Sequence, residues 1–310
     1  MSAQHTFRFG VQVGMGASGE EWKAKARKAE EMGYNILTMP DHFHAQLMAA
    51  PALAAVAAVT TTLRIGTFVL DNDFRHPALV AGDAATLDLL SDGRFELGIG
   101  AGWMQTDYER TGIPFSAPGV RVHRLEESVR IIKGLFGELP VTFTGQHYTI
   151  TDLAGFPRPV QRPHPPVLIG AGGRRMLSFA AREADIVSIV PRISAPNELS
   201  LADLAASVVD EKVEWVREAA GERFSALELN ALIQRVIVTD DQQQATRSLG
   251  EDWGISADSA RESPYLLIGT TKEIADMLCA HRERFGLSYL TVFERDMDAF
   301  APVVTRLSGT

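Results

Sequence analysis

Short β-type runs alternate with helical patterns along most of this 310-residue chain. Alternation of this kind is typical of parallel strands joined by right-handed crossovers. Eight such units favour closure into a ring, so the sequence predicts the α/β class and a (β/α)8 TIM barrel. The eight runs are residues 7–13, 34–39, 63–70, 94–100, 166–170, 185–190, 228–238 and 288–293.

The helices between these runs carry recognisable start signals. Ser18 with Glu21, and Thr270 with Glu273, have the capping-box spacing, in which a hydroxyl and a carboxylate satisfy backbone N–H groups. Pro77 stands where a first helical residue is expected. Apolar stripes at helical spacing predict buried faces. They are Trp22, Ala26, Ala29 and Met32 (ended by Gly33), Leu125, Val129, Ile132 and Phe136, and Ile274, Leu278, His281 and Phe285.

Three segments interrupt the repeat. Residues 141–165 alternate like strands and then become rich in proline, whereas 192–200 and 254–264 are loop-like or short-helical. We interpret them as insertions at the carboxyl-terminal face of the strands. Because the sequence has no low-complexity linker, we predict that residues 1–310 form a single domain.

Composition excludes several classes of function. No run of about 18 apolar residues occurs, so we expect no membrane span. A net charge of −9 disfavours broad binding to nucleic acid or to an anionic membrane and leaves local basic sites open. The single cysteine, Cys279, excludes an internal disulfide, and we expect a packed thiol in a helix over 271–284. With no secretory signal expected over residues 1–12, we predict a cytoplasmic protein.

Glycine-rich segments follow two of the predicted strands. The first carries Gly98, Gly100 and Gly102, and the second is the run Gly170, Ala171, Gly172 and Gly173. Glycine lets backbone N–H groups approach a ligand, and a helix N-terminus favours an anion. The dinucleotide fingerprint fails in both, because Trp103 and Arg175 replace its last glycine. We predict a barrel-type phosphate cradle at 170–173, with charge from Arg174 or Arg175; tight turns that serve packing are the alternative for both segments.

A polar cluster follows the second predicted strand, where active-site residues of a parallel barrel lie. His42 could pass a proton to or from a substrate, and Asp41 could hold its tautomer or accept a ligand N–H. A purely structural histidine is the alternative. His42 and His44 also have a spacing that binds metals, but a catalytic zinc needs three protein ligands and the later strand ends carry no histidine. We therefore predict no metal.

Several motifs occur together in a recognisable order. They are DHF at 41–43, RIGTFVL at 64–70, FRHP at 74–77, TLDLLSDGR at 86–94, GIGAGW at 98–103, PVQRPHPP at 159–166 and GAGG at 170–173. The set resembles the luciferase-like monooxygenase superfamily over about residues 7–295. It is most similar to the branch of coenzyme F420-dependent oxidoreductases of actinobacteria.

The resemblance implies a barrel that binds F420 or a flavin at the carboxyl ends of its strands. Asp41 and His42 would contact the cofactor ring, with His42 in proton transfer. The third strand would end in a bulge with a non-prolyl cis peptide at Phe68–Val69, behind the ring. Gly102 and Trp103 would lie beside the cofactor, and the phosphate cradle carries over to 170–173. Relatives of this kind are often homodimers.

One position departs from the family pattern. F420-dependent sugar-phosphate dehydrogenases carry a proton-donating glutamate after the glycines of the fourth strand, where this chain has Trp103. We therefore expect a more apolar pocket and no activity of that specific kind. Trp103 as ordinary core is the alternative.

Three functional hypotheses follow. The first is an F420-dependent oxidoreductase that moves a hydride between the deazaflavin and a small organic substrate, with His42 as acid or base. The second is an FMN-dependent monooxygenase that uses reduced flavin and oxygen on the same barrel. The third is a barrel that binds a flavin or deazaflavin without turnover.

Overall fold

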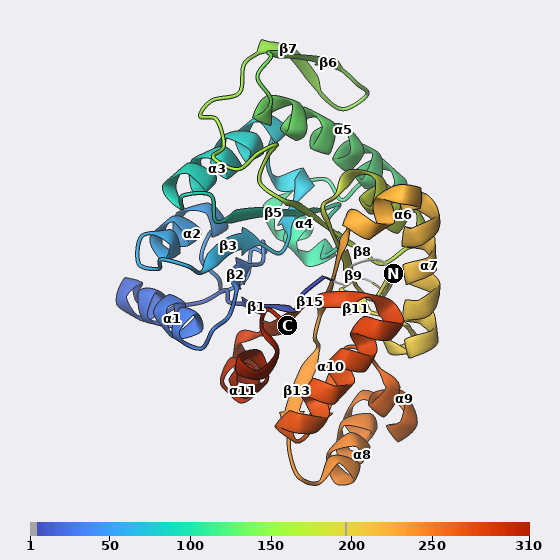
Figure 1. Cartoon of the computed structure of the whole chain (residues 1–310). Coiled ribbons are helices and arrows are strands. Elements are labelled where there is room, and N and C mark those ends of the chain that lie inside the picture. The colour runs from blue at the N-terminus through green and yellow to red at the C-terminus, as the bar shows by residue number, and fades with distance from the viewer. Residues whose placement is uncertain (1–4, 196) are drawn as a thin grey trace. The chain divides into compact units, whose positions relative to one another are not determined.

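The computed structural model describes residues 5–195 and 197–310 (Figure 1). Parts of two predictions, on the first twelve residues and on the insertion at 192–200, fall on residues 1–4 and Pro196 and lie outside the described residues. The chain forms two compact units, which we describe separately. Unit 1 comprises residues 1–13, 28–37 and 171–310, and unit 2 comprises 14–27 and 38–170. The single domain expected over 1–310 stays a prediction.

Unit 1 is built on parallel strands. β1 (Arg8–Gln12) pairs with β15 (Leu287–Phe293), which pairs with β12 (Glu228–Leu232), which in turn pairs with β9 (Ile186–Ile189). Their residues are largely buried, as expected for parallel strands covered on both faces. This explains why the strands appear in the sequence as nearly continuous apolar runs.

Unit 2 contains the strands around the third and fourth predicted runs. β3 (Arg64–Thr67) and β4 (Leu70–Asp71) both pair in parallel with β5 (Phe95–Gly100), so they occupy one strand position that is interrupted at Phe68 and Val69. β5 also pairs with β8 (Val167–Ala171).

The strand order closes the sheet. It runs β3-β2-β1-β15-β12-β9-β8-β5-β4, with a further pairing of β3 and β5, where β2 is Ile36–Met39. With β3 and β4 counted as one position, these are the eight parallel strands of a (β/α)8 barrel. The predicted fold class is confirmed.

The helices begin largely where their caps predict. Thr270 and Glu273 form the expected capping box, and Pro77 lies in the first turn of its helix. Ser18 accepts the Glu21 N–H, but the Glu21 carboxylate accepts from Ala17 rather than from Ser18. The helices are α1 (Gly19–Glu31), α2 (Ala49–Ala57), α3 (Pro77–Leu90), α4 (Gln105–Thr111), α5 (Pro118–Phe136), α6 (Arg174–Glu183), α7 (Ala206–Ala220), α8 (Gln242–Trp253), α9 (Ala257–Glu262), α10 (Thr271–Phe285) and α11 (Met297–Leu307).

The predicted stripes form the buried faces of their helices. Met32 and His281 are the half-buried members, and the other stripe residues are buried. Cys279 lies in α10, half-buried. Within the described ranges, every helix is too short or too polar to cross a lipid bilayer.

One predicted strand is wrong in its extent. Residues 228–238 form two strands, β12 and β13 (Arg235–Val238), and β13 leaves the barrel to pair in parallel with β14 (Leu266–Gly269). The break falls at Ile233 and Gln234, and β14 was not predicted. Leu249, Ala260, Leu266 and Ile268 form a small core beneath α8 and α9 in unit 1.

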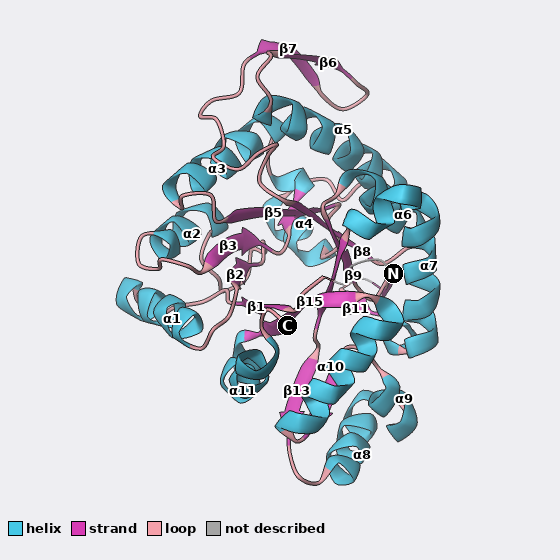
Figure 2. Cartoon of the chain, in the orientation of Figure 1, coloured by secondary structure: helices cyan, strands magenta, loops and turns pink. Residues whose placement is uncertain are grey.

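The predictions for the three insertions had different outcomes. Residues 141–165 begin with an antiparallel hairpin, β6 (Val141–Thr144) and β7 (Thr149–Leu153), which Figure 2 shows beyond α5. Residues 254–264 contain the short helix α9, as expected. The loop or short helix expected at 192–200 is wrong, because β10 (Ile193–Ala195) pairs with β11 (Glu198–Leu199).

Candidate active site

The third strand ends in the predicted bulge. The Phe68–Val69 peptide bond is cis, which confirms the expectation for this position. The Phe68 N–H donates to the Met39 carbonyl at 2.7 Å, so the bulge is joined to the end of β2. Phe68 is buried, so the bulge is packed in place at the carboxyl ends of β2 and β3.

The glycines of β5 make room for this bulge. A Cβ at Gly98 would overlap the Thr67 carbonyl, and one at Gly100 would lie 2.9 Å from Val69 Cγ2. The Thr67 hydroxyl, in turn, donates to the Gly98 carbonyl at 2.7 Å. Close approach of β5 to the third strand thus accounts for both glycines, which favours the packing interpretation of this segment.

Gly102 is required by a different contact. Its φ is +78°, and a Cβ there would overlap the Tyr108 hydroxyl and the Asp71 carboxylate. Only glycine combines this backbone conformation with so close an approach. Its predicted role at the cofactor stays a prediction.

His42 is held by an acid that the sequence patterns missed. Its Nδ1 lies 2.7 Å from Oδ2 of Asp107, a buried residue of α4 whose Oδ1 accepts the Phe43 N–H at 3.1 Å. In the neutral imidazole the proton then lies on Nδ1, which leaves Nε2 as the acceptor. Trp103 meets the His42 ring edge-on with centroids 5.8 Å apart, and His44 stacks on it at 5.1 Å.

Asp41 has other partners. Both of its carboxylate oxygens accept from the Arg75 guanidinium, and Oδ2 also accepts the Asp71 N–H at 3.0 Å. The suggestion that Asp41 holds the tautomer of His42 is therefore wrong, since Asp107 does so. Asp41 instead fixes the end of β2 against the segment after β4.

A buried acidic pair, Asp71 and Asp73, lies at the end of β4. The Tyr108 hydroxyl is 2.9 Å from Asp71 Oδ1 and 3.2 Å from Asp73 Oδ2, and Arg124 pairs with Asp73 at 2.7 Å. Burial raises the pKa of Asp71 to about 7, against the hydrogen bonds that it accepts. Both acids follow the predicted strand 63–70 directly, which is the signal that could have identified them.

The second glycine segment leads into α6. A Cβ at Gly170 would lie 3.6 Å from Val69 Cγ1, whereas one at Gly172 would press on the Val190 and Pro191 carbonyls at 3.0 Å. Gly173 is the N-cap of α6, and no side chain caps this helix. A helix N-terminus without a capping side chain fits an anion.

Arg174 forms an ion pair beside this loop, and its expected role at the phosphate stays a prediction. Its guanidinium lies 3.2 Å from the carboxylate of Glu218 on α7, with both side chains more than half exposed. The ion pair turns the positive charge toward α7, whose packing on α6 is visible in Figure 2.

The structure thus joins most of the predicted residues in unit 2. Met39 contacts Phe68, Val69 lies against Gly100 and Gly170, and His42 touches Trp103. Gly102 contacts Asp71, which binds Asp41. Ala171, Gly172, Gly173 and Arg174 belong to unit 1.

Comparison with known proteins places the chain in a family. The family model of the luciferase-like monooxygenases matches residues 2–288. An F420-dependent glucose-6-phosphate dehydrogenase from Amycolatopsis mediterranei is 36% identical over 188 residues, which cover 56% of each chain. An FMNH(2)-dependent dimethylsulfone monooxygenase from Pseudomonas putida is 28% identical over 256 residues, or 83% of this chain and 65% of that one. The chain spans about half the length of the first curated relatives that it matches.

A solved structure supports the fold. The coenzyme F420-dependent tetrahydromethanopterin reductase from Methanopyrus kandleri superposes with a TM-score of 0.79 and 17% identity, covering 98% of this chain and 99% of that one. At this identity the likeness establishes the barrel alone. The family match over nearly the whole chain goes further, and the chain therefore belongs to the luciferase-like monooxygenase family.

Proposed function

We propose that the protein is an F420-dependent oxidoreductase that moves a hydride between the deazaflavin and a small organic substrate. The observation that carries the proposal is the hydrogen bond between His42 Nδ1 and the buried Asp107 carboxylate. This bond orients the imidazole and leaves Nε2 to exchange a proton. The similarity to F420-dependent glucose-6-phosphate dehydrogenases supports the choice of cofactor.

The residues present fit an anionic redox cofactor. Residues 170–173 precede an α-helix without a capping side chain, and we propose that their backbone N–H groups hold its phosphate. Phe68 and Val69 would support its ring, because the bulge is fixed by the Met39 carbonyl and by the glycines of β5. When bound, F420 supplies hydride transfer, while the protein supplies position and electrostatics.

The proton chemistry belongs to His42. As a base it takes a proton on Nε2, and the Asp107 carboxylate stabilises the imidazolium because it already accepts from Nδ1. As an acid it returns the proton along the same bond. Asp107 therefore acts as a positioning residue for His42.

We propose that the substrate pocket is apolar beside His42. Trp103 presents its ring at the imidazole edge, where sugar-phosphate dehydrogenases of the family carry an acid. We therefore do not propose a sugar phosphate as substrate, although relatives with that activity match the chain.

We also propose that Asp41, Gly102 and Arg174 contact the cofactor. Asp41 is engaged by Arg75, Gly102 is explained by Tyr108, and Arg174 pairs with Glu218. Asp41 and Gly102 lie in the same contact network as His42, and Arg174 is the first residue of α6.

A second candidate is an FMN-dependent monooxygenase. The match to the dimethylsulfone monooxygenase favours it, because that match covers 83% of this chain, more than the dehydrogenases do. Reduced flavin activates oxygen, whereas the deazaflavin does not readily do so.

Competition between the two cofactors tests the proposal. Purified protein is incubated with equimolar F420 and FMN, freed of unbound cofactor, and the retained species is identified by mass. We expect F420, with turnover of a broad alcohol and enone panel that needs no oxygen. Retention of FMN, with oxygen consumption on addition of FMNH₂ and substrate, would establish the monooxygenase instead. Binding of F420 without any turnover would leave a non-catalytic barrel.

A His42→Ala variant tests the role of the imidazole. We expect turnover to fall about a hundredfold while F420 is still retained. His164→Ala, a half-buried histidine outside this cluster, is the matched control and should keep the normal rate. An unchanged rate in His42→Ala would remove His42 from the mechanism.

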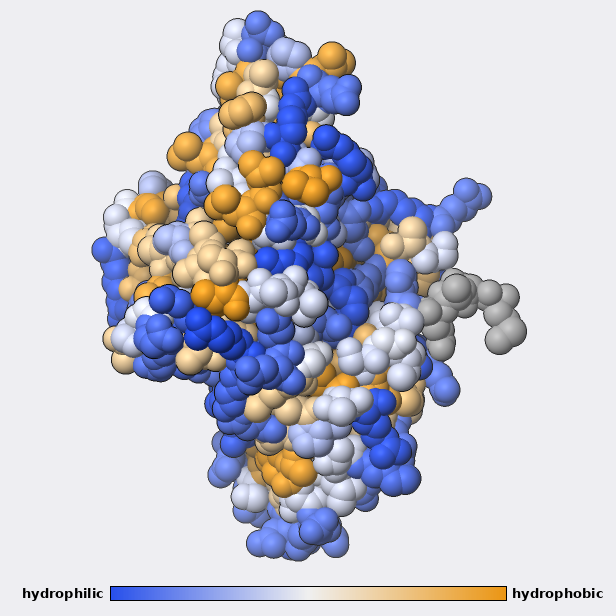
Figure 3. Space-filling model, turned by 60° about the vertical axis from the view of Figure 1, so that its left-hand side comes forward, coloured by the Kyte–Doolittle hydropathy of each residue, from blue (hydrophilic) through white to orange (hydrophobic). Residues whose placement is uncertain are grey.

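We also propose a cytoplasmic homodimer. The single cysteine supports a reducing compartment. Exposed leucines on α3, Leu79, Leu89 and Leu90, supply apolar surface for a second copy, and Figure 3 shows hydrophobic residues in small groups on the face that it presents. Light scattering measures the mass, and a monomer at micromolar concentration would contradict the dimer.

A further inference from the structure

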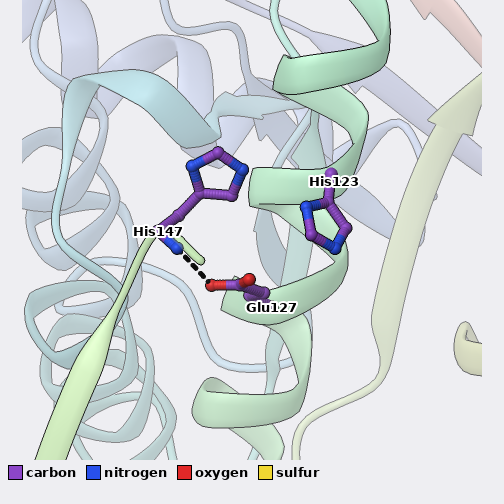
Figure 4. Close-up of side chains that lie close together, drawn as sticks. All are labelled: His123, Glu127 and His147. Carbon is purple, nitrogen blue, oxygen red and sulfur yellow. Dashed lines mark hydrogen bonds between the residues drawn. The ribbon is translucent and has the colours of Figure 1, made fainter. Parts of the chain in front are cut away.

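Three potential metal ligands gather outside the site described above. His123 and Glu127 lie one helical turn apart on α5, and His147 belongs to the turn between β6 and β7 (Figure 4). One donor atom from each of the three side chains lies within 4.8 Å of the other two. All three residues belong to unit 2.

Glu127 ties the hairpin turn to the helix. It is buried, and its carboxylate accepts the backbone N–H groups of Gln146, His147 and Tyr148 at 2.7, 2.9 and 3.1 Å. These bonds lower the pKa of Glu127 against the effect of its burial. A carboxylate has about four lone-pair positions, so one remains for a further ligand.

The turn is shaped to allow this approach. A Cβ at Gly145 would overlap the Glu127 carboxylate, so the glycine lets the chain pass directly over it. The position of His147 relative to α5 is therefore set by backbone contacts and does not depend on its own side chain.

One imidazole nitrogen of this cluster lacks a hydrogen-bond partner among the described residues. His147 Nε2 is enclosed and has no hydrogen-bond partner among the described residues. The His123 and His147 rings meet at 71° with centroids 5.2 Å apart. Enclosed polar atoms in folded proteins are nearly always satisfied, so His147 Nε2 is free to bind a ligand.

We infer that His123, Glu127 and His147 bind a divalent transition metal, with Zn²⁺ as the best fit. Two imidazoles and a carboxylate are one of the ligand sets that zinc takes with a fourth position open to water. Bonds of about 2.1 Å to one ion would bring the donor atoms to about 3.4 Å from one another. Small side-chain rotations that move each donor atom by about 1 Å would complete the site. The sequence patterns missed it, because His123 and Glu127 lie on a helix and His147 comes from a separate element.

The ion would fasten the β6–β7 hairpin to α5. Tyr148, next to His147, has its hydroxyl 3.4 Å from the side-chain amide nitrogen of Asn72, which directly follows β4. The metal would thus hold the hairpin where it meets the end of the third strand. We assign the ion the role of holding this hairpin, with water as its fourth ligand, and this role is independent of the redox reaction proposed above.

Metal binding is tested on the full chain after treatment with EDTA. Titration with Zn²⁺ followed by calorimetry should give one ion per chain with a Kd of about 10 μM or tighter. His123→Gln and His147→Gln should each weaken binding at least about tenfold, and His281→Gln, a half-buried histidine of α10, should bind as the native chain does. Glu127 is left intact, because it also holds the turn.

Hydrogen exchange supplies a second readout. Zn²⁺ should slow exchange of the amides over residues 141–153 in the native chain and in His281→Gln, but not in the two ligand variants. No stoichiometric binding at 100 μM Zn²⁺ would overturn the proposal, as would equal affinity in all variants, which would mean adventitious binding elsewhere. Exchange of the hairpin that does not respond to bound Zn²⁺ would also overturn it.

Discussion

At the scale of single residues, the imidazole of His42 depends on an acid outside the motif that contains it. Asp107 accepts two donors, His42 Nδ1–H and the Phe43 N–H, on its two oxygens. It therefore fixes both the tautomer of the imidazole and the path of the chain that follows. An arrangement of this kind separates the group that exchanges the proton from the group that orients it.

Replacement of Asp107 by Asn should slow turnover through His42. The amide has one carbonyl oxygen for the two donors, so one of them loses its acceptor. We expect kcat to fall about ten- to a hundredfold with cofactor retention unchanged. Glu109→Gln, an exposed acid of the same helix, is the control and should stay within twofold.

The double variant distinguishes positioning from a direct role. If Asp107 acts only through His42, the pair His42→Ala with Asp107→Asn should be no slower than His42→Ala alone. Additive losses in rate would show that Asp107 works independently of the imidazole.

Asp71 should give the protein a stability that falls as pH rises. Burial raises the pKa of its carboxyl in the folded protein to about 7, so between the ordinary pKa of an aspartate and this value the folded state binds more protons than the unfolded state. The free energy of unfolding then decreases from about pH 4 to pH 7, by about 3 kcal/mol.

Urea unfolding between pH 4.5 and 7.5 measures this slope. In Asp71→Asn the decrease should be smaller than in the native chain, because the group no longer titrates. Asp83→Asn, an exposed acid on α3, should follow the native curve. Parallel curves for Asp71→Asn and the native chain would contradict the assignment.

Residue chemistry in the sequence identified part of this site. Asp41 and His42 stand at a strand end, and the resemblance located the cis peptide at Phe68–Val69, which the structure has. Asp107 could not be assigned, because its partner is fixed by the way α4 folds back over the 41–43 segment. The Arg75 partner of Asp41 could not be assigned either, because it comes from the segment after β4, 34 positions further along the chain.

At the scale of secondary-structure elements, the glycines of β5 decide whether the third strand can bulge. Gly98 lies against the Thr67 carbonyl, a backbone atom that cannot move aside without breaking the pairing of β3 with β5. The glycine-rich run is thus a packing surface for the neighbouring strand.

Gly98→Ala should therefore destabilise the protein by about 2–4 kcal/mol. Gly82→Ala is the matched control, because a Cβ at this position in α3 meets nothing within 4 Å. It should raise the free energy of unfolding by up to about 1 kcal/mol through helix propensity. Urea midpoints measure both; equal midpoints for the two variants would show that the close approach at Gly98 is relieved at no cost.

Elements that carry a local sequence signal were predictable, and strands that are defined only by pairing with another strand were not. The capping box at Thr270 and Pro77 in its first turn mark helices that the structure contains. β13 and β14 are stabilised by each other and by the small core under α8. No local sequence pattern predicts that Arg235 pairs with Leu266. The hairpin at 193–199 is likewise defined by its pairing alone.

At the scale of the whole molecule, cofactor binding should increase the free energy of unfolding of the protein. A ligand that binds only the folded state at a hundred times its Kd adds about 2.7 kcal/mol to the free energy of unfolding. For a chain of this size we expect F420 to raise the thermal midpoint by about 5 °C or more. FMN at the same concentration should raise it less, and a larger shift with FMN would favour the monooxygenase.

The fold was the most predictable level. Eight strand–helix units leave few arrangements other than a ring, and the strand order has that ring. The substrate is the least predictable, since the insertions that would shape a pocket differ from their expected structure at 192–200 and extend into a hairpin at 141–153.

The separation between Trp103 and Asp107 has a practical consequence. The Trp103 ring packs perpendicular to the imidazole and the Asp107 carboxylate accepts from its Nδ1, yet the two residues are only four positions apart in the chain. Position 103 can therefore be randomised to widen the range of accepted compounds. Each library should keep Asp107, which orients the imidazole, and Gly102, whose backbone conformation and close contacts require glycine.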